Sequence, residues 1–167
     1  MAKTIDVQLL NPFILATLDC LTEMAKLKPK RQRIFIKNDH LMHGHITGII
    51  GMSNGITGSC TVSFPLRLGT FVVARFLGEE EANISASLLS DGIGEIANMV
   101  AGGAKRRFME TPYRFDISVP TVIIGNPTGL YNPAGSTSIA CEFIATPDIS
   151  ETFLIDIALK PEELLKK

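Results

Sequence analysis

Residues 85–109 read SASLLSDGIGEIANMVAGGAKRRFM, and this stretch decides the fold. At 100° per residue, its recurring apolar side chains fall within about 120° of arc, which is the pattern of a helix with one buried face. That face comprises Leu89, Ile93, Ile96, Val100, Ala104 and Phe108. The sequence therefore predicts a long helix over residues 85–109 that ends before Pro112 and packs on a core.

The opposite face of this helix is polar. It carries a polar stripe of Asp91, Glu95, Asn98, Gly102 and Lys105. The i, i+3 spacing makes Glu95 and Asn98 neighbours on that face. Asparagine is a poor residue for the middle of a helix, because its amide competes for backbone hydrogen bonds.

The same helix contains four glycines, Gly92, Gly94, Gly102 and Gly103. In an exposed helix interior each costs about 1 kcal/mol relative to alanine, so local stability does not explain them. One interpretation is that a partner approaches this face closely where side chains are absent. The other is a solvated face on which Gly102-Gly103 marks a helix break.

Two further helices and six strands are predicted around this element. Apolar spacing indicates a helix over residues 7–27, and residues 66–77 form a shorter helix closed by Gly78. Ser53-Asn54-Gly55 lies between two β-branched runs and predicts a hairpin turn. The predicted strands are residues 33–37, 46–52, 56–64, 115–124, 137–145 and 152–159.

The element order is a helix, three strands and a short helix, followed by the long helix and three more strands. Consecutive strands joined by short turns favour an antiparallel sheet, so we expect an α+β fold with long helices packed on that sheet. Residues 1–167 are predicted to form a single domain. Its halves, about 1–78 and 79–167, share an element order of a helix plus three strands, which makes a pseudo-repeat a hypothesis.

Composition excludes several classes of function. The chain has 16 Lys+Arg against 17 Asp+Glu, a net charge of −1, which argues against a nucleic-acid-binding protein. A basic stretch from Lys26 to Lys37 is interpreted as a solvated connector rather than an anion site. No apolar run is long enough to span a membrane. The three cysteines contain no CxxC pair and are typical of buried thiols in a reducing cytoplasm, so we expect a cytoplasmic protein.

The run Asp91-x-x-x-Glu95-x-x-Asn98-x-x-x-Gly102-x-x-Lys105 resembles the motif of the CheC/CheX/FliY family of chemotaxis phosphatases. That motif is a carboxylate, then Glu-x-x-Asn, then a small residue, on a long exposed helix. With Leu10-Asn11-Pro12-Phe13 and the element order, the chain is most similar to the CheX members. The first predicted helix contains no Glu-x-x-Asn, which favours one site per chain.

The resemblance implies a phosphatase that accelerates loss of the phosphoryl group from the aspartyl phosphate of a CheY-like response regulator. It assigns the catalytic roles to Asn98, which would orient the attacking water, and to Glu95, which would pair with the regulator's active-site lysine. The implied partner-binding residues are Asp91, Gly94, Gly102 and Lys105. No cofactor or metal is expected on this chain, because the Mg²⁺ would belong to the regulator. CheX-like proteins pair through sheet edges, so a homodimer is also implied.

Two other functions stay open at this point. A non-catalytic response-regulator-binding or flagellar-switch adaptor domain would bind the phosphorylated regulator without turnover, although its Glu-x-x-Asn pair would be expected to be damaged. A small metal protein would use His40, His43 and His45 with Asp39, although no further ligand is evident.

Overall fold

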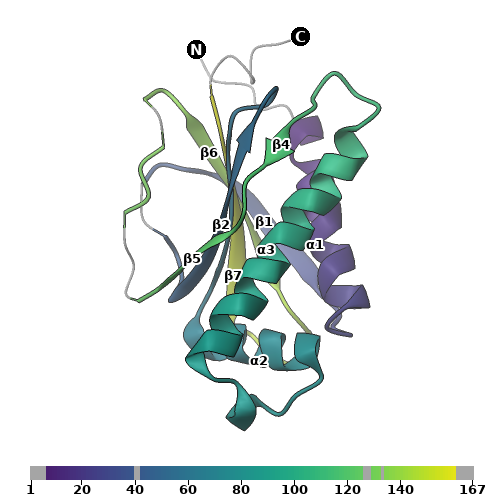
Figure 1. Ribbon diagram of the computed structural model, residues 1–167, viewed down its shortest axis with the longest axis vertical. Helices are drawn as coiled ribbons and strands as arrows, with labels where there is room; N and C mark the ends of the chain where they lie inside the picture. The colour runs from purple at the N-terminus through teal and green to yellow at the C-terminus, as the bar shows by residue number, and fades with distance from the viewer. Residues whose placement is uncertain (1–6, 40–41, 126–128, 133, 161–167) are drawn as a thin grey trace.

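The computed structural model describes residues 7–39, 42–125, 129–132 and 134–160, and within them three α-helices pack on a seven-stranded antiparallel sheet (Figure 1). The helices are α1 (Asn11–Glu23), α2 (Leu66–Leu77) and α3 (Ala86–Phe108), with short 3-10 helices η1 (Val7–Leu9) and η2 (Glu81–Asn83). The strands are β1 (Lys30–Lys37), β2 (Ile46–Ser53), β3 (Gly58–Phe64), β4 (Asp116–Ile117), β5 (Thr121–Ile124), β6 (Thr137–Ile144) and β7 (Thr152–Leu159). The predicted α+β class is confirmed.

The two halves of the chain share one sheet. The strand order is β1-β6-β7-β3-β2-β4, and β5 also pairs with β2, so the second-half strands β6 and β7 lie between β1 and β3. Exchanging β1 with β4–β5, β2 with β6 and β3 with β7 reverses this order and otherwise leaves it unchanged. The edges of the sheet are therefore β1 on one side and the β4–β5 segment on the other.

Helix α3 matches its predicted bounds to within one residue at each end. It begins after Ser85, whose hydroxyl accepts a hydrogen bond from the backbone N–H of Leu88 at 3.1 Å. Its last turn carries Lys105, Arg106 and Arg107, where cations interact favourably with the helix dipole. All the apolar side chains predicted to face the core are buried. In Figure 1, α3 crosses the front of the molecule beside α1.

Two predicted turns are also present. Asn54 has φ of 59° and Gly55 has φ of 144°, which is the positive-φ backbone that the hairpin between β2 and β3 requires. Helix α2 spans the predicted residues and ends at Gly78, which caps it in the left-handed conformation with φ of 70°.

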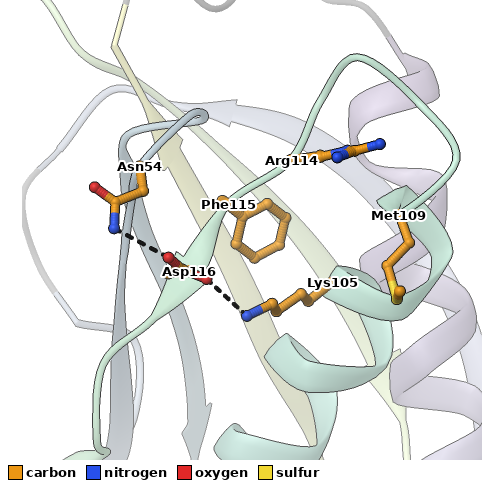
Figure 2. A pocket seen from close by; sticks show the side chains of 6 residues that line it. All are labelled: Asn54, Lys105, Met109, Arg114, Phe115 and Asp116. Atoms are coloured by element: carbon orange, nitrogen blue, oxygen red, sulfur yellow. Dashed lines mark hydrogen bonds and ion pairs between the residues drawn. The ribbon is translucent and has the colours of Figure 1, made fainter.

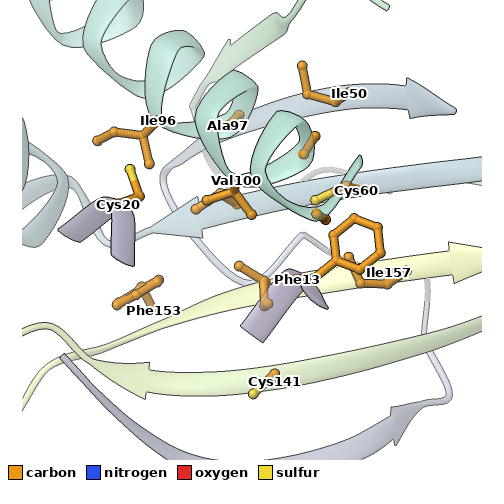
Figure 3. Close-up of a cluster of buried hydrophobic side chains, with 14 of the residues drawn as sticks. Phe13, Cys20, Ile50, Cys60, Ile96, Ala97, Val100, Cys141, Phe153 and Ile157 are labelled. Atoms are coloured by element: carbon orange, nitrogen blue, oxygen red, sulfur yellow. The ribbon is translucent and has the colours of Figure 1, made fainter. Parts of the chain in front are cut away.

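The core lies between the sheet and the helices (Figure 3). Phe13 of α1 has its ring centroid 6.0 Å from the rings of Phe108 and Phe115, which ties α1 to the C-terminal end of α3. The three cysteines are free and buried, as predicted. Burial raises the pKa of Cys20 and Cys141 to about 12 and also raises that of Cys60, so these thiols are packing residues rather than nucleophiles.

The first helix is shorter than predicted. Residues 7–9 form η1, and α1 ends at Glu23 because Lys26 turns the chain with φ of 55°. The N–H of Leu27 then bonds to the carbonyl of Leu21 at 3.1 Å and closes the helix end. The N-cap residue of α1 is Leu10, which makes no side-chain capping bond.

The predicted strand over residues 115–124 is two strands, β4 and β5. Pro120 lies between them and has no N–H to donate to the sheet. Next to this break, the Ser118 hydroxyl accepts a hydrogen bond from the backbone N–H of Gly51 in β2 at 2.9 Å, in place of a backbone carbonyl. Within the basic stretch, the predicted strand over residues 33–37 is confirmed as part of β1, which begins three residues earlier, so the interpretation as a connector holds only for the residues before Lys30. Lys37 there is largely buried and pairs with Asp156 at 2.8 Å.

Candidate functional site

The polar stripe lies along the outer side of α3. Asp91 and Glu95 are exposed, whereas Asn98, Gly102 and Lys105 are half-buried. The stripe therefore has an acidic end in the first half of α3 and a cationic end in its last turns.

Glu95 and Asn98 lie one helical turn apart and are available to a partner. Among the residues that the structure describes, neither side chain forms a hydrogen bond or an ion pair. The charge of Glu95 adds to burial in raising the pKa of Cys20 to about 12, so the carboxylate lies within electrostatic range of α1. The carboxylate can therefore pair with a cation of a partner protein, and the amide can hydrogen-bond to a water molecule.

The structure corrects the interpretation of most of the helix glycines. A Cβ at Gly92 would lie 2.6 Å from Val73 Cγ1 of α2, and one at Gly103 would lie 2.8 Å from the Ala16 Cβ of α1. These two glycines are buried and let neighbouring helices approach α3 closely, so they need no external partner to explain them.

Gly94, which was expected to bind the partner, is buried as well. A Cβ there would lie 3.3 Å from Val122 Cγ2, with Pro120 next to it, so this glycine accommodates β5. Gly102 differs, because a Cβ would have ordinary contacts only, the nearest being Ile117 Cδ1 at 3.9 Å. It is therefore the one glycine of the four that packing inside the described chain does not require.

Lys105, at the cationic end of the stripe, is held by a polar chain that sequence reasoning missed. Its Nζ donates to Asp116 Oδ1 of β4 at 2.8 Å, and Asp116 Oδ2 accepts from Asn54 Nδ2 at 3.0 Å (Figure 2). Both carboxylate oxygens are thus used, while the ammonium keeps donors to spare. Lys105, Asp116 and Asn54 share no repeat in the sequence. They meet because the register of the sheet places β4 beside the end of α3.

This polar chain should make part of the stability depend on pH. The hydrogen bond from Lys105, then that from Asn54, then the Lys105 charge lower the pKa of Asp116. A lowered folded-state pKa adds stability above the ordinary aspartate pKa of about 4 and loses it as pH falls through the lowered pKa. We expect Asp116→Asn to lower the urea midpoint at pH 7 and to lower it by less at about pH 3, below the ordinary aspartate pKa, where part of this contribution is already lost. An effect equal at both pH values would contradict this assignment.

The histidine cluster does not form a metal centre among the described residues. His43 Nε2 lies 3.2 Å from Asp39 Oδ1, and His40 falls outside the described residues. The described part of the chain contains no group of three or more His, Cys, Asp or Glu side chains that could hold a metal ion. In the same part, no helix has the length and hydropathy that crossing a membrane requires.

Comparison with known proteins identifies the family. The model of the family described as chemotaxis phosphatase CheX matches residues 46–144, more than half of the chain and all of the polar stripe. The chain belongs to this family. The expectations of a CheX-like fold and of a chemotaxis phosphatase are thereby confirmed.

Individual relatives agree with this assignment. The CheY-P phosphatase CheX of Thermotoga maritima is 28% identical over 72% of this chain and 77% of its own length. A CheC-like superfamily protein from Shewanella sp. PV-4 is 30% identical, with a TM-score of 0.82 over 93% of this chain and 99% of that one. A CheX–CheY–BeF3–Mg²⁺ complex from Borrelia burgdorferi is 22% identical, with a TM-score of 0.75 over 94% and 99% of the two chains, and shows the shared fold.

Proposed function

We propose that this chain removes the phosphoryl group from the aspartyl phosphate of a CheY-type response regulator, with Asn98 orienting the attacking water. The observation that carries the proposal is the Glu95–Asn98 pair, which has no internal partner among the described residues and lies on the outer helix of a chemotaxis phosphatase fold. The Thermotoga relative is a CheY-P phosphatase and the Borrelia neighbour is bound to CheY, which supports this class of substrate.

The proposed reaction needs no nucleophile, metal ion or general base from this chain. The water oxygen forms a bond to phosphorus while the bond from phosphorus to the aspartyl oxygen breaks, which yields inorganic phosphate and a carboxylate; the water proton passes to the phosphate or to solvent. Such a transfer depends on an in-line water and on neutralised charge more than on a covalent catalyst. The Asn98 amide can accept from the water and donate to it without titrating, so it suits this task.

Glu95 has a separate role in the proposal. Its exposed carboxylate would pair with the regulator's active-site lysine and set the angle at which α3 enters that site. The Mg²⁺ that neutralises the phosphoryl oxygens would be bound by the regulator. Around this pair, Asp91, Gly102 and Lys105 would contact the partner, and Gly94 is left out because β5 covers it.

We also infer a single site per chain and a homodimer in the cytoplasm. The strand order is consistent with a pseudo-repeat of residues 1–78 and 79–167, in which α1 corresponds to α3 but carries no Glu-x-x-Asn. The sheet edges carry exposed apolar side chains, Ile36 on β1 and Ile124 on β5, at 43% and 44% exposure. Pairing through such edges would supply the dimer, and sedimentation equilibrium tests it.

The deciding experiment follows the decay of a phosphorylated CheY-type regulator from the same genome with substoichiometric amounts of this protein. Faster decay with multiple turnovers supports the phosphatase. Stable binding that depends on phosphorylation, with unchanged decay, would instead favour the adaptor function. Unchanged decay and no binding with every such regulator of the genome would exclude both.

A further inference from the structure

A hollow of about 360 Å³ lies at the cationic end of the polar stripe (Figure 2). It is lined by Asn54, Lys105, Met109, Arg114, Phe115 and Asp116. Phe115 is 3% exposed, whereas Met109 at the end of α3 is 60% exposed. The hollow therefore combines a buried aromatic residue, an open and adaptable thioether and several charges, which is a composition typical of contact surfaces.

The hollow lies within reach of any globular partner that contacts Asn98. Lys105 is seven residues beyond Asn98, which at 1.5 Å per residue is about 10 Å along α3. A standard interface covers about 800 Å² of each partner, which corresponds to a patch with a radius of about 15 Å. A regulator centred on the Glu95–Asn98 pair would therefore cover the hollow as well.

The charges around the hollow differ from those at the other end of the stripe. Lys105 uses one donor on Asp116, and Arg114 is exposed and forms no ion pair within the described residues. The hollow thus has a net positive charge, whereas Asp91 and Glu95 make the other end negative. A partner that matches both ends must place a cation near Glu95 and an anion near Lys105, so the stripe accepts it in one orientation only.

We propose that this hollow is a second contact site for the phosphorylated regulator, in which an apolar regulator side chain packs on Met109 above the buried Phe115 and regulator carboxylates pair with Lys105 and with Arg114. The proposal rests on the phosphatase function above and adds where the regulator is held and which way it faces. Asp116 and Asn54 are positioning residues, because they hold the Lys105 ammonium at the wall of the hollow.

A contact about 10 Å from the reacting atoms binds the regulator equally before and during phosphoryl loss. Its removal should therefore raise KM and leave kcat unchanged. This separates the hollow from Asn98, whose loss acts on the chemical step.

The experiment measures steady-state dephosphorylation with Arg114→Glu and Met109→Ala. We expect KM for the phosphorylated regulator to rise about tenfold in Arg114→Glu and about fivefold in Met109→Ala, with kcat within twofold of wild type. The Arg114→Glu effect should shrink as salt is added, and the Met109→Ala effect should not. The matched control is Arg75→Glu in the last turn of α2, an equal change of charge at an exposed position outside the polar stripe, the hollow and both sheet edges, which should leave KM unchanged.

A binding measurement without turnover uses the regulator loaded with Mg²⁺ and beryllofluoride. Arg114→Glu and Met109→Ala should weaken its binding by the same factors as they raise KM. If wild type accelerates decay while both variants keep the wild-type KM and affinity, the second contact site is refuted and the phosphatase function stands. If KM rises equally in Arg75→Glu, the effect is one of net charge and the proposal is also refuted. If wild type does not accelerate decay, the phosphatase function itself fails.

Discussion

Asn98→Ala is expected to lower kcat for regulator dephosphorylation by about 10²–10³-fold while KM stays within about twofold of wild type. The reason is that no other side chain of the polar stripe can replace the amide. Asp91 and Glu95 only accept hydrogen bonds when ionised, and Lys105 only donates them. A water that must be held from both sides would lose its orientation, and single-turnover and steady-state decay of the phosphorylated regulator measure this loss.

Two matched variants sharpen this prediction. Asn83→Ala makes the same change in η2, off the stripe, and should keep full activity. Asn98→Asp preserves shape but removes the donor and adds a negative charge, so it should be as inactive as Asn98→Ala. Thermal unfolding should be similar in all three, since Asn98 has no hydrogen-bond partner among the described residues. An Asn98→Ala variant with more than half of the wild-type kcat would show that the water-orienting role is wrong.

Glu95→Ala should behave differently and mainly raise KM, because the role we propose for its carboxylate is to set the docking geometry and not to orient the water. The contrast between the two variants tests whether the roles within the pair are assigned correctly.

Gly92→Ala is expected to destabilise the fold by about 1–3 kcal/mol, although alanine is the better helix former by about 1 kcal/mol. The new Cβ would lie 2.6 Å from Val73 Cγ1 and 2.9 Å from Val73 Cγ2, and Val73 is fully buried. α2 and α3 would have to separate or Val73 would have to leave its rotamer. Urea unfolding at neutral pH measures the change in the free energy of unfolding.

The same helix provides the control. Gly102→Ala would place a Cβ no closer than 3.9 Å to another side chain, so it should stabilise the fold by about 0.5–1 kcal/mol. In a Val73→Ala background, Gly92→Ala should cost far less than in wild type, because the clashing methyl groups are gone. Equal stabilisation by both glycine substitutions would contradict the packing explanation.

Local patterns predicted most of the helices and strands and the pair at the centre of the candidate site. Helices α2 and α3 follow from apolar spacing with Ser85 and Gly78 as end signals, and those signals act within a few residues. The adjacency of Glu95 and Asn98 follows from helix geometry alone. The ends of α1 and the break between β4 and β5 were less predictable, because they depend on a left-handed Lys26 and on contacts of Ser118 with β2.

The sequence by itself determined which face of α3 is buried and which residues line the polar stripe, since both follow from a repeat of 3.6 residues per turn. Only the tertiary structure decided what covers that helix. Gly92, Gly103 and Gly94 lie against Val73, Ala16 and Val122, respectively. Packing of neighbouring helices and a strand therefore explains these glycines without an external partner. The tertiary structure also brought Asp116 and Asn54 to Lys105 and made the hollow beside Met109. The physical reason is that the apolar repeat of a helix shows which of its positions are buried. The residues that bury them come from distant segments of the chain, and the register of the whole sheet decides which segments these are.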